Sequence, residues 1–177
     1  MPTVNRESSI LLVVDFQSKL VPAIDDSMSV VANARRLLDA AEMLQVPILF
    51  TEQNANGLGS TVPELRSDSG RLTHKMTFDA CRTAGFLETI ADRHDLVVSG
   101  CEAHVCVLQT VLGLLSAGRR VYVVRDAVGS RRSESKETAI RRMERNGAEI
   151  VTTEMVVFEW LETAEHPRLR DMIAVIR

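Results

Sequence analysis

Short, uninterrupted apolar runs recur along this chain, separated by amphipathic segments long enough to form helices. Such runs are rich in Val, Ile and Leu. They occupy residues 10–14, 46–50, 96–98, 121–124 and 150–151, with a shorter candidate near residues 73–76. Continuous rather than alternating apolar residues are typical of strands covered on both faces, as in a parallel sheet. The alternation of strands with helices therefore predicts an α/β layer architecture with a mostly parallel sheet.

Length, charge and cysteine content narrow the protein class. A chain of 177 residues is long enough for one domain, spanning residues 1–177, with a core of its own. The 21 Lys and Arg against 24 Asp and Glu leave a net charge of -3, which provides no electrostatic footprint for nucleic acid. Three cysteines with no secretory pattern before them indicate a reducing compartment, the cytoplasm. Because no apolar stretch approaches about 20 residues, we expect no membrane span.

Three helices and one long loop stand out between the apolar runs. Residues 30–44 and 133–146 read as amphipathic helices, whereas residues 106–117 are apolar almost all round. The latter helix is therefore expected to be buried on more than one side, with a subunit interface as the second side, which predicts a homo-oligomer. The longest irregular segment, residues 53–72, is expected to be a functional loop.

Three chemically capable residues lie where parallel strands place ligands. Asp15 ends the first strand, Lys75 lies in the short third strand, and Cys106 opens the helix after the strand at residues 96–100. Ligands bind outside the carboxyl ends of such strands, so these side chains are expected to converge on one rim. Taken singly, each has a structural alternative: a capping Asp, a solvated Lys and a buried Cys.

The charges expected around Cys106 act in opposite directions. A helix N-terminus and the Lys75 ammonium stabilise a thiolate, whereas the Asp15 carboxylate disfavours it and is a natural acceptor for the thiol proton. The thiol is thus expected to stay neutral until substrate arrives. The turn at residues 100–106 can also aim consecutive backbone N–H groups at a substrate oxygen, or it is an ordinary strand-to-helix loop.

These segments together resemble a known family, the isochorismatase-like cysteine hydrolases. The resemblance is carried by residues 11–17 (LLVVDFQ), 73–78 (THKMTF) and 99–106 (SGCEAHVC), in that order. Residues 51–53 (TEQ) and 57–59 (GLG) are closer to the subgroup of isochorismatase-domain-containing proteins than to nicotinamidases. The similarity spans about residues 8 to 160.

The resemblance implies a fold, a mechanism and roles for particular residues. The fold would be three-layer and Rossmann-like, a mostly parallel six-stranded sheet flanked by helices. Cys106 would be the nucleophile, Asp15 the base, and Lys75 the group that orients and stabilises charge. The family's non-proline cis peptide maps to the bond between Cys101 and Glu102, and the backbone N–H groups of Glu102 and Cys106 would form an oxyanion hole.

Two departures from relatives sharpen the expected chemistry. True isochorismatases lack a cysteine at the nucleophile position, so Cys106 argues for hydrolysis of an amide-like carbon–nitrogen bond through a thioester. Nicotinamidases carry a metal site after the second strand, but residues 51–59 contain no His. We therefore expect no metal and no cofactor. The partner would be a small-molecule substrate, in a pocket lined by Phe16, Gln17, Phe78 and His104.

Other readings remain beside the hydrolase. The main alternative is a non-catalytic ligand-binding or scaffold protein that keeps the fold. A phosphoacceptor receiver domain would need an acidic cluster where this chain has Lys75. A dithiol role for Cys101 and Cys106 lacks the Cys-x-x-Cys spacing of disulfide oxidoreductases. A nucleotide enzyme would need a glycine-rich phosphate motif that is absent from the sequence.

Overall fold

A single six-stranded sheet organises the molecule. The computed structural model describes residues 3–90 and 95–176. The strands lie in the order β3-β2-β1-β4-β5-β6, and every neighbouring pair is parallel. The α/β architecture expected from the apolar runs is thus confirmed, and the sheet is fully parallel rather than mostly so. The strands are β1 (Ser9–Val14), β2 (Ile48–Gln53), β3 (Arg71–Lys75), β4 (Asp95–Cys101), β5 (Arg120–Gly129) and β6 (Glu149–Val151).

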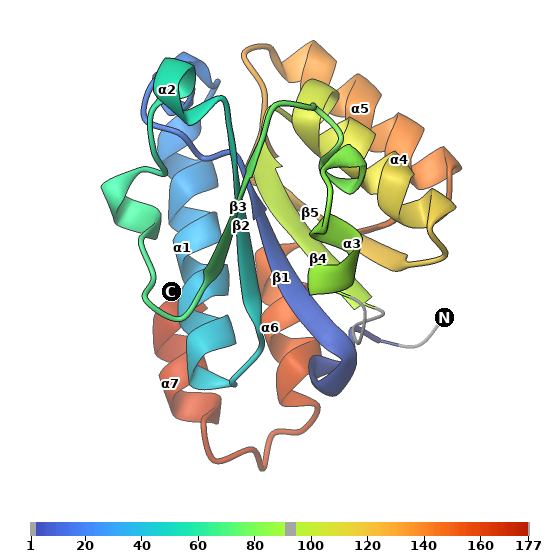
Figure 1. The fold of residues 1–177 in the computed structure, drawn as a ribbon. Coiled ribbons are helices and arrows are strands. Elements are labelled where there is room, and N and C mark those ends of the chain that lie inside the picture. Colours follow the sequence, from blue (N-terminus) through green and yellow to red (C-terminus); the bar gives the residue numbers. More distant parts are fainter. Residues whose placement is uncertain (1–2, 91–94, 177) are drawn as a thin grey trace.

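Helices cover both faces of the sheet and complete three layers (Figure 1). One face packs against α1 (Ser27–Met43), α6 (Thr153–Leu161) and α7 (Leu169–Ile176), and the other against α3 (Phe86–Thr89), α4 (Leu108–Ser116) and α5 (Ser133–Arg145). Strands β1 and β4 are buried along their whole length. Two apolar clusters therefore form the core, one on each side of the sheet.

The remaining elements are short and lie mostly in the connections. They are η1 (Arg6–Ser8), η2 (Val21–Ala23), α2 (Ala55–Leu58), η3 (Pro63–Leu65), η4 (Ala80–Arg82) and the π-helix η5 (Ala103–Val107). The segment at residues 53–72, expected to be irregular, thus contains two single-turn helices. None of the helices in the described part of the chain is long and apolar enough to cross a membrane.

The order of the strands creates a natural binding edge. From β1 the chain moves outward through β2 to β3, and then returns to place β4 on the other side of β1. The loops that leave the carboxyl ends of β1 and β4 therefore separate, which is where open parallel sheets bind ligands. Gly100 is required at this point, because a Cβ there would lie 2.6 Å from the Val14 carbonyl oxygen.

Candidate active site

Asp15, Lys75 and Cys106 come from three parts of the carboxyl edge of the sheet. Asp15 directly follows β1 with φ 51°, and Lys75 is the last residue of β3. Cys106 lies in η5, the π-helix that follows β4 and runs into α4. Residues separated by up to 91 positions are therefore brought to one edge, and two of them are in direct contact.

The Asp15 carboxylate is fully buried and has a basic partner that is fully buried too. Lys75 Nζ donates to Asp15 Oδ2 at 2.6 Å, and both side chains are inaccessible to solvent. Thr51 Oγ1, on the intervening strand β2, donates to Asp15 Oδ1 at 2.6 Å. Burying a carboxylate is costly unless it is paired and hydrogen-bonded, and both conditions are met here.

The Lys75 ammonium is held by three oxygen acceptors. Besides Asp15, its Nζ donates to the carbonyl oxygens of Thr77 at 3.2 Å and Phe78 at 3.5 Å. An ammonium has three N–H donors, so this set accounts for all of them. The segment that follows β3 therefore folds back over the lysine and fixes its charge beside Asp15.

Cys106 lies close to these charges with its thiol in the neutral form. The peptide bond between Cys101 and Glu102 is cis, and η5 begins directly after it. The pKa of the Cys106 thiol is raised to about 12, because burial and, to a smaller extent, the negative charge of Asp15 outweigh the positive charge of Lys75, which lowers it. At neutral pH the resting thiol thus keeps its proton.

Gln53 is a site residue that the sequence analysis did not single out. It ends β2, and its Oε1 accepts a hydrogen bond from Cys106 Sγ at 2.9 Å. The available signal was its position at the same sheet edge and its place in the TEQ match to the family. The nucleophile expected from sequence therefore has a neutral amide as its hydrogen-bond partner.

Gln17, expected to line a pocket, instead braces the chain around Gln53. Its Nε2 donates to the carbonyl oxygens of Gln53 at 2.9 Å and Gly59 at 2.6 Å, and its Oε1 accepts from the Gln53 backbone N–H at 2.9 Å. Phe16 is also buried, within the core on the α1 side of the sheet. Gln17 therefore supports the backbone around Gln53, and Phe16 contributes to the core.

Phe78 and His104 lie nearer to solvent. The Phe78 side chain is half-exposed, and its carbonyl oxygen accepts from Lys75. His104 Nδ1 lies 3.0 Å from Ser130 Oγ. Glu102 Oε1 accepts from Arg131 Nε at 2.8 Å, so the turn before Cys106 is tied to the loop after β5.

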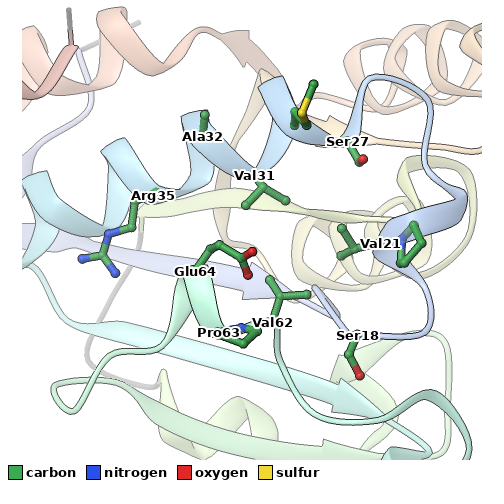
Figure 2. Close-up of a pocket in the computed structure, with 11 residues that line it drawn as sticks. Ser18, Val21, Ser27, Val31, Ala32, Arg35, Val62, Pro63 and Glu64 are labelled. Atoms are coloured by element: carbon green, nitrogen blue, oxygen red, sulfur yellow. The ribbon is translucent and has the colours of Figure 1, made fainter.

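One large cavity lies away from the candidate catalytic residues. A cavity of about 660 Å³ lies between η2, the start of α1 and η3, and Figure 2 shows Val21, Val31 and Val62 around it. None of Asp15, Lys75 and Cys106 lines it. A second cavity, of about 500 Å³, is bordered by Lys75 together with residues of the loops after β2 and β3, among them Asn54 and Thr77. It therefore lies closer to the charged pair.

The residues of a metal site do not gather in this region. Within residues 3–90 and 95–176, no three His, Cys, Asp or Glu side chains are arranged so that they can hold a metal ion. All three cysteines are free thiols.

Comparisons with known proteins agree with this architecture. A family model described as the isochorismatase domain matches residues 9–155. Isochorismatase domain-containing protein 2 of Xenopus laevis is 35% identical over 173 residues, covering 97% of this chain and 84% of that protein.

Solved structures give the same picture in three dimensions. The structure titled MAR1 ribonuclease from Caenorhabditis elegans is 34% identical, with a TM-score of 0.94 over 98% of this chain and 92% of that one. The YcaC gene product of Escherichia coli, described as an octameric hydrolase of unknown specificity, is 25% identical, with a TM-score of 0.88 over 98% of this chain and 87% of that one.

Proposed function

The chain belongs to the isochorismatase domain family, a family of hydrolase-like proteins, and on that premise we propose that it hydrolyses a small amide-like carbon–nitrogen bond through Cys106. The observation that carries the proposal is the fully buried Asp15–Lys75 pair beside a neutral, buried thiol. A thiol with a raised pKa beside a buried ion pair, at the ligand-binding edge of a parallel sheet, is the arrangement expected of a catalytic centre.

In the first half-reaction, attack and proton transfer occur together. The Cys106 thiol gives its proton to the Asp15 carboxylate while Sγ bonds to the carbonyl carbon. The oxygen of the tetrahedral intermediate accepts from the backbone N–H groups of Glu102 and Cys106. The carbon–nitrogen bond then breaks, and the amine leaves with the proton held by Asp15.

Water completes the cycle. It attacks the carbonyl carbon of the thioester while Asp15 accepts its proton. The carbon–sulfur bond then breaks as Asp15 returns that proton to Sγ, which releases the acid and restores both the thiol and the carboxylate. The Lys75 ammonium, 2.6 Å from Asp15 Oδ2, balances the negative charge of the buried carboxylate and fixes its position.

The similar structure from Caenorhabditis elegans is described as a ribonuclease, which suggests a phosphodiester as an alternative substrate. The candidate site of this chain supports that alternative less well. A thioester requires an acyl carbon, and Cys106 is the nucleophile that this chain offers beside the charged pair. The charge of Lys75 is already matched by Asp15 at 2.6 Å, so the pair offers no net positive charge to a phosphate. The whole chain carries a net charge of -3, which also disfavours RNA.

A screen of small amides for ammonia release tests the proposal. Wild type should turn over at least one of them, Cys106→Ser should lose at least about a thousandfold in rate, and Cys81→Ser should retain the wild-type rate. Denaturation of wild type during the assay should yield an acyl adduct on Cys106 by mass spectrometry. Full activity of Cys106→Ser would contradict thiol catalysis. A ligand that binds without turnover, unaffected by Asp15→Asn, would favour the non-catalytic binding protein.

We also propose that the protein works as a homo-oligomer. On α4, Leu112 and Leu115 are only partly buried although the helix is apolar, so a neighbouring copy would cover them. The related E. coli protein is described as octameric. Light scattering at micromolar concentration should give a multiple of 19.6 kDa, and a monomer would contradict the proposal.

A further inference from the structure

The group that holds the Cys106 thiol at rest is a neutral amide. Cys106 Sγ donates to Gln53 Oε1 at 2.9 Å, whereas the proposed mechanism sends the same proton to Asp15. An amide oxygen accepts a hydrogen bond but is not one of the side-chain groups that take up a proton. The thiol hydrogen must therefore turn away from Gln53 before the proposed attack begins.

The backbone of Gln53 is fixed on both sides of the residue. Its N–H donates to Gln17 Oε1 at 2.9 Å, and its carbonyl oxygen accepts from Gln17 Nε2 at 2.9 Å. The next residue, Asn54, donates its backbone N–H to the Lys75 carbonyl oxygen at 2.9 Å. Gln17 is itself fully buried, which shields its bonds to Gln53 from water. The side chain of Gln53 is thus the part of the residue that can turn.

The side-chain amide of Gln53 has a donor in reserve. Its Nε2 donates to no atom of residues 3–90 and 95–176, and the residue is half-buried. The last torsion of a glutamine side chain is broad and roughly two-fold, so a half-turn exchanges Oε1 for Nε2 without straining the rest of the chain. One amide can therefore present either an acceptor or a donor to the same sulfur.

The protonation of the sulfur decides which end of the amide it needs. A thiol has one hydrogen to donate, whereas a sulfur that has lost its proton can only accept. Without a turn, the partly negative Oε1 would remain 2.9 Å from a negative sulfur. The positive charge of Lys75 favours that form of the sulfur, but its three N–H groups already have oxygen acceptors. A further hydrogen-bond donor would stabilise the deprotonated sulfur.

We propose that Gln53 is a catalytic residue that exchanges the two ends of its amide during the reaction. Oε1 accepts from the neutral Cys106 thiol at rest. When the thiol proton moves to Asp15, the amide turns and Nε2 donates to Sγ, during the attack and again when the carbon–sulfur bond of the thioester breaks. No covalent bond to Gln53 forms, and the amide turns back when Asp15 returns the proton. This role in catalysis rests on the proposed function, but the effect of Gln53 on the sulfur is measurable without a substrate.

Alkylation of Cys106 in the absence of substrate tests the turn. Gln53→Met keeps a side chain of similar length and removes the amide. If Nε2 donates to the deprotonated sulfur, labelling by iodoacetamide at pH 9 should slow by about tenfold, because a charge-assisted bond is lost and outweighs the weak bond from the thiol. If Gln53 acts as an acceptor alone, its removal destabilises the neutral thiol and labelling becomes faster. The sign of the change therefore decides between the two roles.

Matched variants separate this effect from packing. Gln45→Met, in the exposed turn between α1 and β2, should label at Cys106 as wild type does. Gln53→Leu also lacks the amide and should slow labelling as much as Gln53→Met. Cys81, measured in the same mass spectra, should keep its wild-type rate in all three variants. Faster or unchanged labelling of Cys106 in both Gln53 variants would overturn the proposal, and so would an equal slowing in Gln45→Met.

Turnover separates the role of Gln53 from the reaction itself. With an amide identified by the screen, Gln53→Met should lower kcat at least about tenfold and change KM by less than about threefold, because the contact is made to the reacting sulfur. Slower labelling with no hydrolysis of any amide would retain the hydrogen bond to the sulfur and reject the proposed function. Hydrolysis by Gln53→Met at the wild-type rate would retain the function and reject the role of Gln53.

Discussion

Two buried carboxylates lie at opposite ends of the same pair of strands and differ in what surrounds them. Asp15 follows β1 at the carboxyl edge, and Asp95 begins β4 at the amino edge. Each side chain is fully buried with a basic partner and a hydroxyl donor. Lys75 is itself fully buried, whereas the Arg120 side chain beside Asp95 is 42% exposed. A buried ion pair alone therefore does not indicate a reaction. Asp15 differs from Asp95 in that its partner is fully buried too and the pair lies close to the Cys106 thiol, and on this difference the proposed function rests.

The largest difference between the two ends is expected when each carboxylate is removed in turn and the turnover rate is measured. Asp15→Asn should lower the turnover of an amide identified by the screen by about a hundredfold to ten thousandfold, because it removes the proton acceptor. Asp95→Asn should leave the rate within about twofold, since the other edge takes no part in the reaction. Initial rates on folded protein measure both. Equal losses would mean that Asp15 acts only through stability.

Removing the basic partner of each carboxylate should lower the free energy of unfolding by different amounts at the two ends. Lys75→Met leaves the Asp15 charge buried without a cation and should lower the free energy of unfolding by about 3–5 kcal/mol. Arg120→Met should cost about 1 kcal/mol, because the Arg120 side chain is 42% exposed and water can reach Asp95 once the guanidinium is removed. Urea denaturation measures the difference. A larger loss of stability for Arg120→Met than for Lys75→Met would contradict the view that Asp15 depends more on its buried partner than Asp95 does.

Removing the hydroxyl donor of each carboxylate should lower the free energy of unfolding by smaller amounts, again with the larger loss at Asp15. Thr51→Val keeps the side-chain shape and removes the hydrogen bond to Asp15 Oδ1, which should cost about 1.5–3 kcal/mol. Ser8→Ala removes the corresponding bond to Asp95 Oδ2, and water can replace that hydroxyl beside the partly exposed Ser8. We expect its cost to be about 1 kcal/mol or less in the same denaturation measurement. Similar costs for both would remove the distinction.

The smallest difference between the Asp15 and Asp95 variants is expected in the reactivity of the Cys106 thiol. With its pKa raised to about 12, Cys106 should react with iodoacetamide roughly a thousandfold more slowly at pH 8 than a free thiol of pKa about 8.5, and its rate should keep rising as the pH rises. Asp15→Asn removes a negative charge and therefore lowers the pKa of Cys106. Labelling at pH 8 should become about tenfold faster for each pH unit by which that pKa falls. Asp95→Asn should have no effect. Mass spectrometry of labelled Cys106 from pH 7 to 10 measures this, and slower labelling of Asp15→Asn would contradict the electrostatic account.

Periodicity predicted the layers better than the lengths of the elements. The cores of β1 and β4 follow from their apolar runs, because burial on both faces selects such residues. Strand β5 extends to Gly129, beyond the expected residues 121–124, since its second half rejoins β4 after a register shift between Val98 and Gly100. The charged Arg125 and Asp126 interrupt the apolar pattern there. Local composition does not encode such non-local pairing.

The candidate site shows the same division between what is local and what is not. The geometry of parallel sheets was enough to predict that Asp15, Lys75 and Cys106 lie at one edge, because each residue ends or follows a strand. The contact of Gln53 with Cys106 depends on how the loop after β4 folds over β2, which no spacing reveals. Gln17 was expected in the pocket for its position after Asp15, but its amide is consumed by backbone groups of Gln53 and Gly59.

The position of β3 at an edge of the sheet has a consequence for the dynamics of the site. Lys75 is the one fully sheltered residue of a strand whose remaining side chains are exposed or half-exposed, and β2 is the strand that pairs with it. Edge strands open more readily than central ones, in local fluctuations that leave the core folded. Assembly of the charged pair is thus a local folding equilibrium: each time β3 detaches, Asp15 loses its ammonium while the rest of the sheet stays intact.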